Sequence, residues 1–214
     1  GGAGFYLRTL LYGPPSGPPS IASVRNSLEK EMENKGADVM YERLTSLDPE
    51  YARTITMHDK QKIVRGLEII QLTNERVSQQ KWKFEGPPRD YDFLCWFIFR
   101  PREVLYERIE KRCEEMLADG LINEAQDLQE KGLIENLSAK NSIGYRQVLQ
   151  FLETQQTEED YQQLLKDFKT ASRHYAKRQF TWFRKEPLFR WLNVELHDIE
   201  TAADMIIQDF KARL

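Results

Sequence analysis

One uninterrupted apolar run decides the fold class: residues 93–99, with the sequence FLCWFIF. The length and aromatic content of this run favour a strand buried on both faces, as in a parallel sheet, over a short buried helix. Pro101 suits the first position of a helix, which we expect to continue to about Asp119 and to end at Gly120. A strand followed directly by a helix indicates an α/β sheet.

Downstream of this strand and helix the pattern is mostly helical. Helical periodicity continues to about Leu152, and a long helix is expected over about residues 158–184, because Pro187 ends it. Residues 189–194 predict a short second strand. The last predicted helix carries an apolar face formed by Ile199, Ala202, Ala203, Ile206 and Phe210.

Two proline-rich breaks mark the upstream boundaries. Residues 13–20 (GPPSGPPS) and 86–88 (GPP) do not suit a helix interior or a central strand, because proline fixes φ and lacks an N–H. Between them, Asp48 (followed by Pro49) and Asp59 are placed to begin helices. We therefore predict three parts: a core segment at 1–14, a helical insertion domain at 15–88, and a C-terminal part of the core at 89–214.

The composition excludes several classes of protein. The 214 residues carry a net charge of −3, which is too close to zero for a bulk electrostatic binder, so any nucleic-acid contact must come from local clusters. Two cysteines do not make a disulfide scaffold, and no apolar run approaches the ~20 residues that span a bilayer. We expect a cytoplasmic, monomeric protein with no signal peptide and no membrane contact.

The strongest local signal is the basic segment 173–190. On a helix it presents a basic stripe, an aromatic and amide stripe, and an apolar stripe, formed by Arg173, Lys177 and Arg184, by Tyr175, Gln179 and Trp182, and by Ala176, Phe180 and Phe183, respectively. Cations beside aromatic rings suit phosphate contacts with base stacking, and they also suit a diphosphate pocket. A solvated basic face above a core stripe fits the same pattern, so the segment alone leaves both interpretations open.

Three weaker patches leave similar alternatives open. Arg108 and Arg112 share a helix face, but nearby glutamates offer ordinary surface ion pairs. Residues 60–65 (KQKIVR) fit a solvated helix face, and residues 142–147 (SIGYRQ) fit either base recognition or a turn at a helix junction. The sequence has no spacing typical of a metal site, no G-x-S-x-G nucleophile elbow and no complete G-x-x-x-x-G-K-S/T phosphate loop.

Five blocks of the sequence together resemble the tRNA dimethylallyltransferase family. In chain order they are residues 1–8 (GGAGFYLR), 58–68 (HDKQKIVRGLE), 100–112 (RPREVLYERIEKR), 143–147 (IGYRQ) and 176–184 (AKRQFTWFR). One such block would be weak evidence for the family. Five blocks in the family's order cover essentially the whole chain, and together they are specific for the family.

The resemblance implies an enzyme that transfers a dimethylallyl group from dimethylallyl diphosphate to the exocyclic amine of adenosine 37 of tRNA. It implies an α/β fold with a P-loop-type core, of the kind that binds ATP and other nucleotides, and a helical insertion domain. This chain then holds only the C-terminal part of that core, with few strands, and is predominantly helical. The target base is flipped out into a reaction channel, while Mg²⁺ and basic groups stabilise the departing diphosphate.

The family's phosphate loop and its general-base Asp lie upstream of the first block. We therefore expect the chain to be a truncated enzyme that is inactive by itself. Mg²⁺ is expected to be held by the diphosphate and by that upstream part, with no metal ligand among these residues.

The family's functional positions transfer to this sequence in two groups. The tRNA contacts are expected at Ala3, Arg25, Gln61, Lys62, Ile63, Val64, Arg65, Asn141, Ser142, Ile143, Gly144, Tyr145 and Arg146. The catalytic contact with the diphosphate is expected at Arg112, and three further residues are expected near the diphosphate and the channel: Lys177, Arg178 and Arg184.

Two positions depart from the family pattern. Ala3 stands where relatives usually have Thr, whose hydroxyl is expected to contact the reacting adenosine, and Ala cannot make that hydrogen bond. Asn141 stands where Arg is frequent, which removes one phosphate contact. If the parent enzyme is active, these contacts are dispensable or supplied elsewhere.

Two other functions stay open on the sequence alone. The chain could be a non-catalytic module that holds an anticodon stem-loop, or a nucleotide kinase-like protein, which the five blocks do not favour. A phosphate loop followed by an Asp in an upstream sequence would support the transferase, whereas an unrelated upstream domain would support the binding module.

Overall fold

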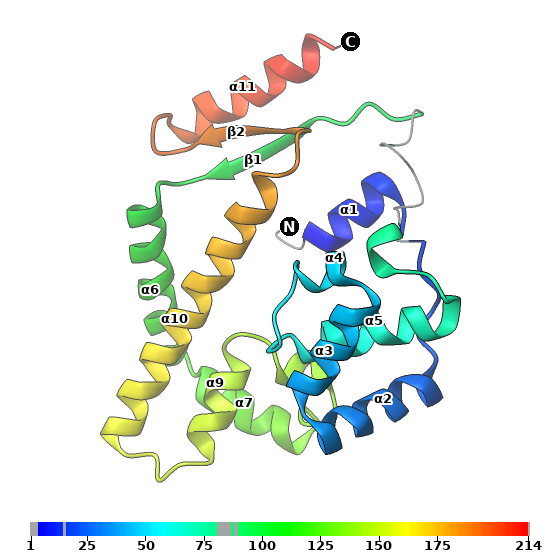
Figure 1. The fold of residues 1–214 in the computed structure, drawn as a ribbon. Helices are drawn as coiled ribbons and strands as arrows, with labels where there is room; N and C mark the ends of the chain where they lie inside the picture. Colours follow the sequence, from blue (N-terminus) through cyan, green and yellow to red (C-terminus); the bar gives the residue numbers. More distant parts are fainter. Residues whose placement is uncertain (1–3, 15, 81–86, 88–89, 214) are drawn as a thin grey trace. The chain divides into compact units, whose positions relative to one another are not determined.

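The structure, a computed structural model, describes residues 4–14, 16–80, 87 and 90–213 (Figure 1). The chain divides into two compact units: an N-terminal unit formed by Phe5–Asp92, and a C-terminal unit formed by Phe93–Leu214 together with Gly4. The division after Asp92 lies close to the predicted boundary at residues 88–89. Residues 5–14, predicted as a core segment, group with the N-terminal unit.

The N-terminal unit is helical. Its elements are α1 (Gly4–Tyr12, which starts at the unit boundary), α2 (Ala22–Lys35), α3 (Ala37–Leu47), α4 (Pro49–Ala52), α5 (Lys60–Thr73) and the 3-10 turn η1 (Val77–Gln79). Helices α2 and α3 both pack against α5, and their shared core contains Leu28, Met32, Met40, Leu44, Ile55, Ile63, Val64 and Leu67. This unit therefore has a hydrophobic core of its own.

Of the two predicted helix starts of this unit, one has a side-chain cap and the other does not. Asp48 begins α4 as predicted: its buried carboxylate accepts a hydrogen bond from the Tyr51 N–H at 3.0 Å, and a second from the Ser78 N–H at 2.8 Å. Asp59 does stand at the start of α5, but its side chain caps no N–H of that helix. It accepts a hydrogen bond from the Thr56 N–H instead, so its carboxylate orders the preceding turn.

A buried carboxylate ties the proline-rich segment to α5. Glu68, which is fully buried, accepts hydrogen bonds from the Ser20 hydroxyl at 2.6 Å and from the Ile21 N–H at 2.9 Å. Arg65 completes the cluster with an ion pair to Glu68 at 2.7 Å and a hydrogen bond to the Pro18 carbonyl. The chain entering α2 is thereby fixed on the helical core.

The C-terminal unit combines a small sheet with helices. Its elements are β1 (Cys95–Phe99), α6 (Arg102–Ala118), α7 (Leu121–Glu130), α8 (Leu137–Lys140), α9 (Tyr145–Leu152), α10 (Glu158–Phe183), β2 (Phe189–Asn193) and α11 (Ile199–Lys211). Helices α6, α7, α9 and α10 enclose a second core around Cys113, Leu117, Ala125, Val148, Leu164 and Phe168. The predicted mixture of a small parallel sheet and many helices is confirmed.

The run at residues 93–99 forms β1, and the prediction of a parallel sheet is confirmed. β1 pairs in parallel with β2, with Cys95 opposite Phe189 and Phe99 opposite Asn193. Burial on both faces is wrong: Ile98 is 57% exposed, and the other residues of β1 are half-buried. The reason is that the sheet has two strands within the described residues, too few to cover both faces of either strand.

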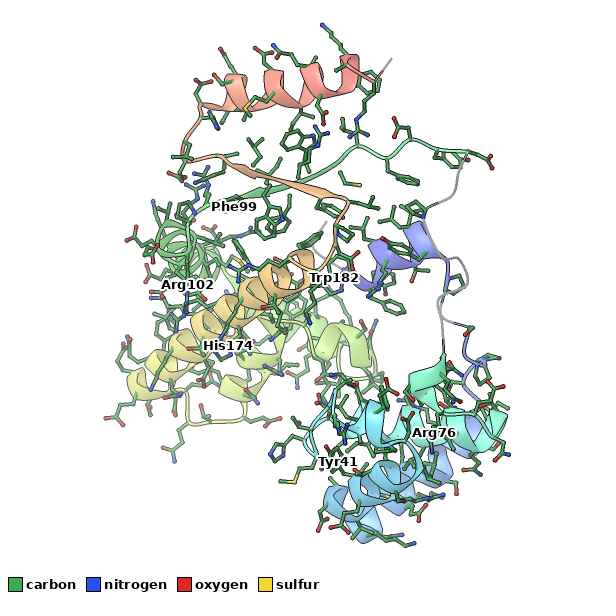
Figure 2. All side chains as sticks on the ribbon, turned by 45° about the horizontal axis from the view of Figure 1, so that its top comes forward. Tyr41, Arg76, Phe99, Arg102, His174 and Trp182 are labelled. Atoms are coloured by element: carbon green, nitrogen blue, oxygen red, sulfur yellow. The ribbon has the colours of Figure 1, made fainter. Side chains whose placement is uncertain are left out.

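An aromatic cluster joins this sheet to the end of α10. The Phe97 ring lies 4.5 Å from both the Phe183 and the Trp191 rings, and 5.4 Å from the Phe180 ring. Phe180 and Phe183 of the apolar stripe predicted on α10 therefore pack against the sheet, and Ala176 of the same stripe is buried. Figure 2 shows Phe99 and Arg102 at the point where β1 passes into α6.

The predicted apolar face of α11 is largely uncovered. Ala202 is buried and Ile206 is half-buried, but Ile199 and Phe210 are 82% and 53% exposed. The physical reason is again the width of the described sheet, which offers α11 only a narrow surface. Among the described residues, no helix combines the length and apolar character needed to cross a membrane.

Candidate functional site

The basic face of α10 supplies the centre of the candidate site. Lys177, Arg178 and Arg184 are exposed on this helix, as the sequence predicts. Arg173, predicted in the same stripe as Lys177 and Arg184, contacts other side chains and lines neither of the cavities described below. It forms an ion pair with Glu110 of α6 and donates a hydrogen bond to the Thr170 hydroxyl, so it joins the two helices.

A cavity of about 720 Å³ lies between α6, α10 and the segment before α9. It brings together Arg112 from α6, residues 141–143 and Arg178 from α10, which are far apart in the sequence. The rest of the lining is mostly apolar on the α6 side and mixed on the α10 side, with Ile109, Met116, Phe168, Tyr175 and Gln179 among its members. We call this the large cavity.

The polar groups of the large cavity are partly engaged. The Asn141 side-chain amide donates to the Leu137 carbonyl at 2.8 Å, and the Ser142 hydroxyl donates to the Ala139 carbonyl at 2.7 Å. The Arg178 guanidinium lies 5.6 Å from the centre of the Tyr175 ring. A cation and an aromatic ring held side by side offer both a phosphate contact and a stacking surface.

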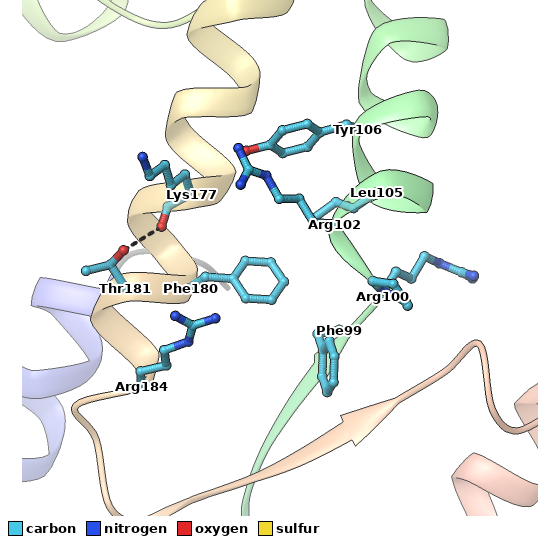
Figure 3. A pocket seen from close by; sticks show the side chains of 10 residues that line it. Phe99, Arg100, Arg102, Leu105, Tyr106, Lys177, Phe180, Thr181 and Arg184 are labelled. Atoms are coloured by element: carbon cyan, nitrogen blue, oxygen red, sulfur yellow. Dashed lines mark hydrogen bonds between the residues drawn. The ribbon is translucent and has the colours of Figure 1, made fainter.

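A second cavity, of about 290 Å³, lies where β1 ends and α6 begins (Figure 3). Lys177 and Arg184 reach it from α10, and Arg102 reaches it from the first turn of α6. Its remaining lining is Phe99, Arg100, Pro101, Leu105, Tyr106, Phe180 and Thr181. We call this the small cavity.

Adjacent residues of α10 therefore serve different cavities. Lys177 and Arg178 are one residue apart, which turns their side chains about 100° from each other around the helix axis. Lys177 lines the small cavity and Arg178 lines the large one. Of the four residues predicted at the diphosphate and channel, two fall in each cavity: Lys177 and Arg184 in the small one, Arg112 and Arg178 in the large one.

Five of the cations at the two cavities have no ion-pair partner among the residues that the structure describes. Within the part of the chain that the structure describes, no carboxylate lies in ion-pair range of Arg102, Arg112, Lys177, Arg178 or Arg184. By contrast, Arg100 pairs with Glu195, and Lys111 pairs with Glu115. Each cavity therefore has at least two positive side chains that no carboxylate of the described residues neutralises.

The remaining residues of the 141–146 stretch lie around the start of α9. Gly144 is buried with φ of 101°, and its N–H donates to the Gln147 side chain at 2.9 Å. The Tyr145 hydroxyl donates to the Glu124 carboxylate, and this hydrogen bond raises the pKa of Tyr145 above its ordinary value. Arg146 is exposed to solvent.

The N-terminal unit presents only part of its predicted RNA contacts at the surface. Gln61 and Lys62 are exposed, and Lys62 lies 3.3 Å from Asp59; Arg25 pairs with Glu29 at 2.9 Å. Ile63 and Val64 are 0% and 3% exposed in the core of this unit, so the structure does not present their side chains to a ligand. Five consecutive helical residues span more than one turn, so they cannot all face outward.

Arg65 differs from the other predicted RNA contacts in having partners inside its own unit. It is half-buried and already bound to Glu68 and Pro18, so its first role is structural. Ala3, the remaining predicted contact, lies outside the described residues.

Several lining residues were not singled out by the sequence. Arg102, Tyr106, Phe99 and Thr181 belong to the small cavity. The signal for Phe99, Arg102 and Tyr106 was their position at or just after the carboxyl end of a parallel strand, the edge where α/β sheets place ligands, whereas Thr181 lies on α10 and had no such signal. Tyr175 and Gln179 were noted as an aromatic and amide stripe, and they line the large cavity.

Comparison with known proteins decides the family. The family model described as IPP transferase matches residues 1–186. The chain belongs to this family. It is 59% identical over 211 residues to the tRNA dimethylallyltransferase of Protochlamydia amoebophila (strain UWE25), a match that covers 99% of the chain and 61% of that protein. It is 44% identical to the tRNA dimethylallyltransferase of Chlamydia caviae, covering 98% of the chain and 62% of that protein.

Solved structures agree with this assignment. The chain matches the tRNA delta(2)-isopentenylpyrophosphate transferase of Staphylococcus epidermidis with a TM-score of 0.59 and 30% identity, covering 99% of the chain and 67% of that structure. A eukaryotic dimethylallyltransferase acting on tRNA shares the fold, with a TM-score of 0.61. The resemblance seen in the five sequence blocks is confirmed, and the IPP transferase chain spans about three fifths of the length of the curated relatives it matches.

Proposed function

We propose that this chain provides tRNA-binding and diphosphate-binding surfaces of a tRNA dimethylallyltransferase. The reaction transfers a dimethylallyl group from dimethylallyl diphosphate to the exocyclic amine of adenosine 37. The proposal includes a P-loop-type core for the complete enzyme and a cytoplasmic location. It follows the family membership and the names of the relatives.

One observation carries the proposal. The large cavity gathers Arg112, residues 141–143 and Arg178, which the family resemblance of the sequence independently assigns to tRNA and diphosphate. These residues come from two helices and a connecting segment. They are far apart in the sequence, so only the fold brings them together. Cations, amide groups and an aromatic ring in one concave site suit an unpaired RNA segment with its phosphates.

The chemistry assigns a definite task to the cations. The adenosine amine attacks the first carbon of the dimethylallyl group, the carbon–oxygen bond to the diphosphate breaks, and the diphosphate leaves with the bonding electrons. Arg112 is proposed to stabilise the negative charge that develops on the diphosphate, with Arg178 in the same cavity and with Lys177 and Arg184 at the small cavity. The amine proton passes to a general base that we assign to no residue of this chain.

Mg²⁺ is proposed only as an ion that arrives with the diphosphate. Within the described residues there is no group of three or more His, Cys, Asp or Glu side chains that could hold a metal. No step is therefore assigned to the ion.

The proposal has two testable parts. First, the 214-residue chain should bind an anticodon stem-loop RNA, measured by fluorescence anisotropy, but should not transfer a labelled dimethylallyl group, because these residues hold no complete phosphate loop. Second, Arg112→Ala in a complete enzyme that contains this sequence should lower turnover more than tRNA affinity. Failure of the chain to bind the stem-loop contradicts the RNA part, and equal loss of tRNA binding with intact chemistry contradicts the role of Arg112.

Binding without transfer also fits the alternative, a non-catalytic tRNA-binding module. Transfer by the complete enzyme distinguishes the two functions. If the complete enzyme binds the stem-loop but transfers no dimethylallyl group under any donor concentration, the binding module is the correct function.

A further inference from the structure

We infer that the small cavity binds a phosphate group and that Arg102, held in place by Tyr106, is a further phosphate-binding residue. This inference deepens the proposed function and rests on it. The phosphate could belong to the diphosphate of the prenyl donor or to the backbone of the RNA, and binding measurements with two probes distinguish these sources.

Three cations besides Arg100 meet at the small cavity, and no acid is among its lining residues. Arg102 approaches from α6, and Lys177 and Arg184 approach from α10 (Figure 3). None of the three has a carboxylate in ion-pair range within the described residues. Like charges gathered around a concave, partly apolar surface repel one another, and an anion bound between them offsets this electrostatic repulsion.

The start of α6 adds to the positive potential. α6 is 17 residues long, and its N-cap residue is Pro101, which makes no side-chain hydrogen bond to the first turn. The free N–H groups and the helix dipole both favour an anion at this end. The same place is the carboxyl end of β1, where ligands of parallel sheets bind.

Tyr106 accounts for the orientation of Arg102. The Arg102 guanidinium carbon lies 5.0 Å from the centre of the Tyr106 ring, one helical turn further along α6. A cation–π contact of this kind restrains a long side chain before any ligand binds. Figure 3 shows Arg102 directed toward α10, whereas Arg100 points away, and Arg100 is paired with Glu195.

The floor of the cavity limits what the ligand can carry. Phe99, Leu105 and Phe180 form an apolar floor, and the volume is about 290 Å³. That is at the lower end of small-molecule sites, so the cavity suits one phosphate-bearing group with a short substituent rather than a whole folded RNA element.

The test compares Arg102→Gln with Lys111→Gln in the 214-residue chain. Lys111 lies on the same helix, is exposed, pairs with Glu115 and lines neither cavity, so its substitution removes an equal charge elsewhere. The probes are inorganic diphosphate, measured by calorimetry, and anticodon stem-loop RNA, measured by anisotropy at several salt concentrations. Circular dichroism checks that each variant is folded.

Arg102→Gln should lower the affinity for one of the two probes about tenfold, as expected for the loss of a charge-assisted hydrogen bond. Lys111→Gln should leave the affinity for both probes unchanged. A loss confined to diphosphate identifies the prenyl donor as the source. A loss confined to the stem-loop, with a salt slope reduced by about 0.7 to 0.9, identifies an RNA phosphate. Tyr106→Leu should give part of the same loss, and Tyr106→Phe, which keeps the ring, should not.

Two results would overturn the inference, and they differ in whether the proposed function is retained. If Arg102→Gln matches Lys111→Gln with both probes while Lys177→Gln weakens binding, the proposed function stands and Arg102 has no part in it. If the unaltered chain binds neither probe, the proposed function and this inference fail together.

Discussion

At the scale of single residues, Glu68 shows how a buried charge can hold two segments together. Burial opposes its ionisation, but the hydrogen bonds from Ser20 and Ile21 and the contact with Arg65 outweigh burial and keep the pKa of Glu68 below its ordinary value of 4.5. A carboxylate with a lowered pKa in the folded state stabilises that state fully above its unfolded pKa. This stability is lost as the pH falls through the folded pKa.

Glu68→Gln should therefore destabilise the protein and change its response to acid. We expect a loss of about 1–3 kcal/mol in the free energy of unfolding at pH 7, because Arg65 loses its charged partner. The difference from the unaltered protein should shrink as the pH falls below 4.5 and through the lower pKa of the folded state, because Glu68 then becomes protonated in both states. Urea denaturation between pH 3 and 7 measures this, with the exposed Glu42→Gln as control; a difference that is constant with pH contradicts the role of the charge.

Lys62 is the most accessible cation of the predicted RNA stretch on α5. Its side chain is 57% exposed and its contact with Asp59 is a surface pair of little strength. Lys62→Ala should weaken stem-loop binding and reduce the salt slope by about 0.7 to 0.9, as for one lost phosphate contact. Lys30→Ala, an exposed lysine on α2, is the control, and an unchanged salt slope for Lys62→Ala removes Lys62 from the interface.

At the scale of elements, much of the secondary structure could be predicted because local rules fix it. The apolar run at 93–99 contains β1, the predicted helix at 158–184 is α10 at Glu158–Phe183, and Asp48 with Pro49 begins α4. Burial could not be predicted in the same way. How far Ile98 or Phe210 is covered depends on neighbouring strands, which the periodicity of one segment does not report.

The site was predictable to a similar extent. Residue types and family blocks predicted Arg112, the 141–146 stretch and the cations at 177, 178 and 184, and the structure places Arg112, residues 141–143 and these three cations at the two cavities. The helical periodicity placed Lys177 but not Arg178 on the basic stripe. It did not show that the two residues line different cavities, because that depends on which helices and strands lie on each side of α10. Neither the periodicity nor the blocks identified Arg102, which reaches the small cavity only when α6 lies beside α10.

Gly144 connects an element boundary to the large cavity. Its φ and ψ of 101° and −71° are accessible to glycine but strained for other residues, and it follows directly after the cavity residues 141–143. Gly144→Ala should cost about 3 kcal/mol of unfolding free energy and weaken stem-loop binding. Gly120→Ala, at φ 102° and ψ 22° with open space around it, should cost only about 1 kcal/mol; equal costs for the two variants contradict a special backbone at Gly144.

At the scale of the whole molecule, the two units have separate hydrophobic cores, one around Leu44 and Ile63 and the other around Val148 and Phe168. The tie made by Glu68 and Arg65 lies wholly within the N-terminal unit, where it holds the proline-rich segment on α5. Each unit thus contains most of the contacts that hold its own helices.

A fragment of residues 16–80 should therefore fold by itself into a helical domain. It contains the whole cluster around Leu28, Met32, Met40, Leu44 and Leu67, but a core of this size supplies no more than about 3–5 kcal/mol. Leu44→Ala, at a fully buried position, should cost about 2–5 kcal/mol and abolish the cooperative thermal transition seen by circular dichroism. Leu47→Ala, at a 40% exposed position of the same helix, should leave the transition within a few degrees of its original midpoint. A fragment that melts without cooperativity before any substitution means that the N-terminal unit depends on residues outside 16–80.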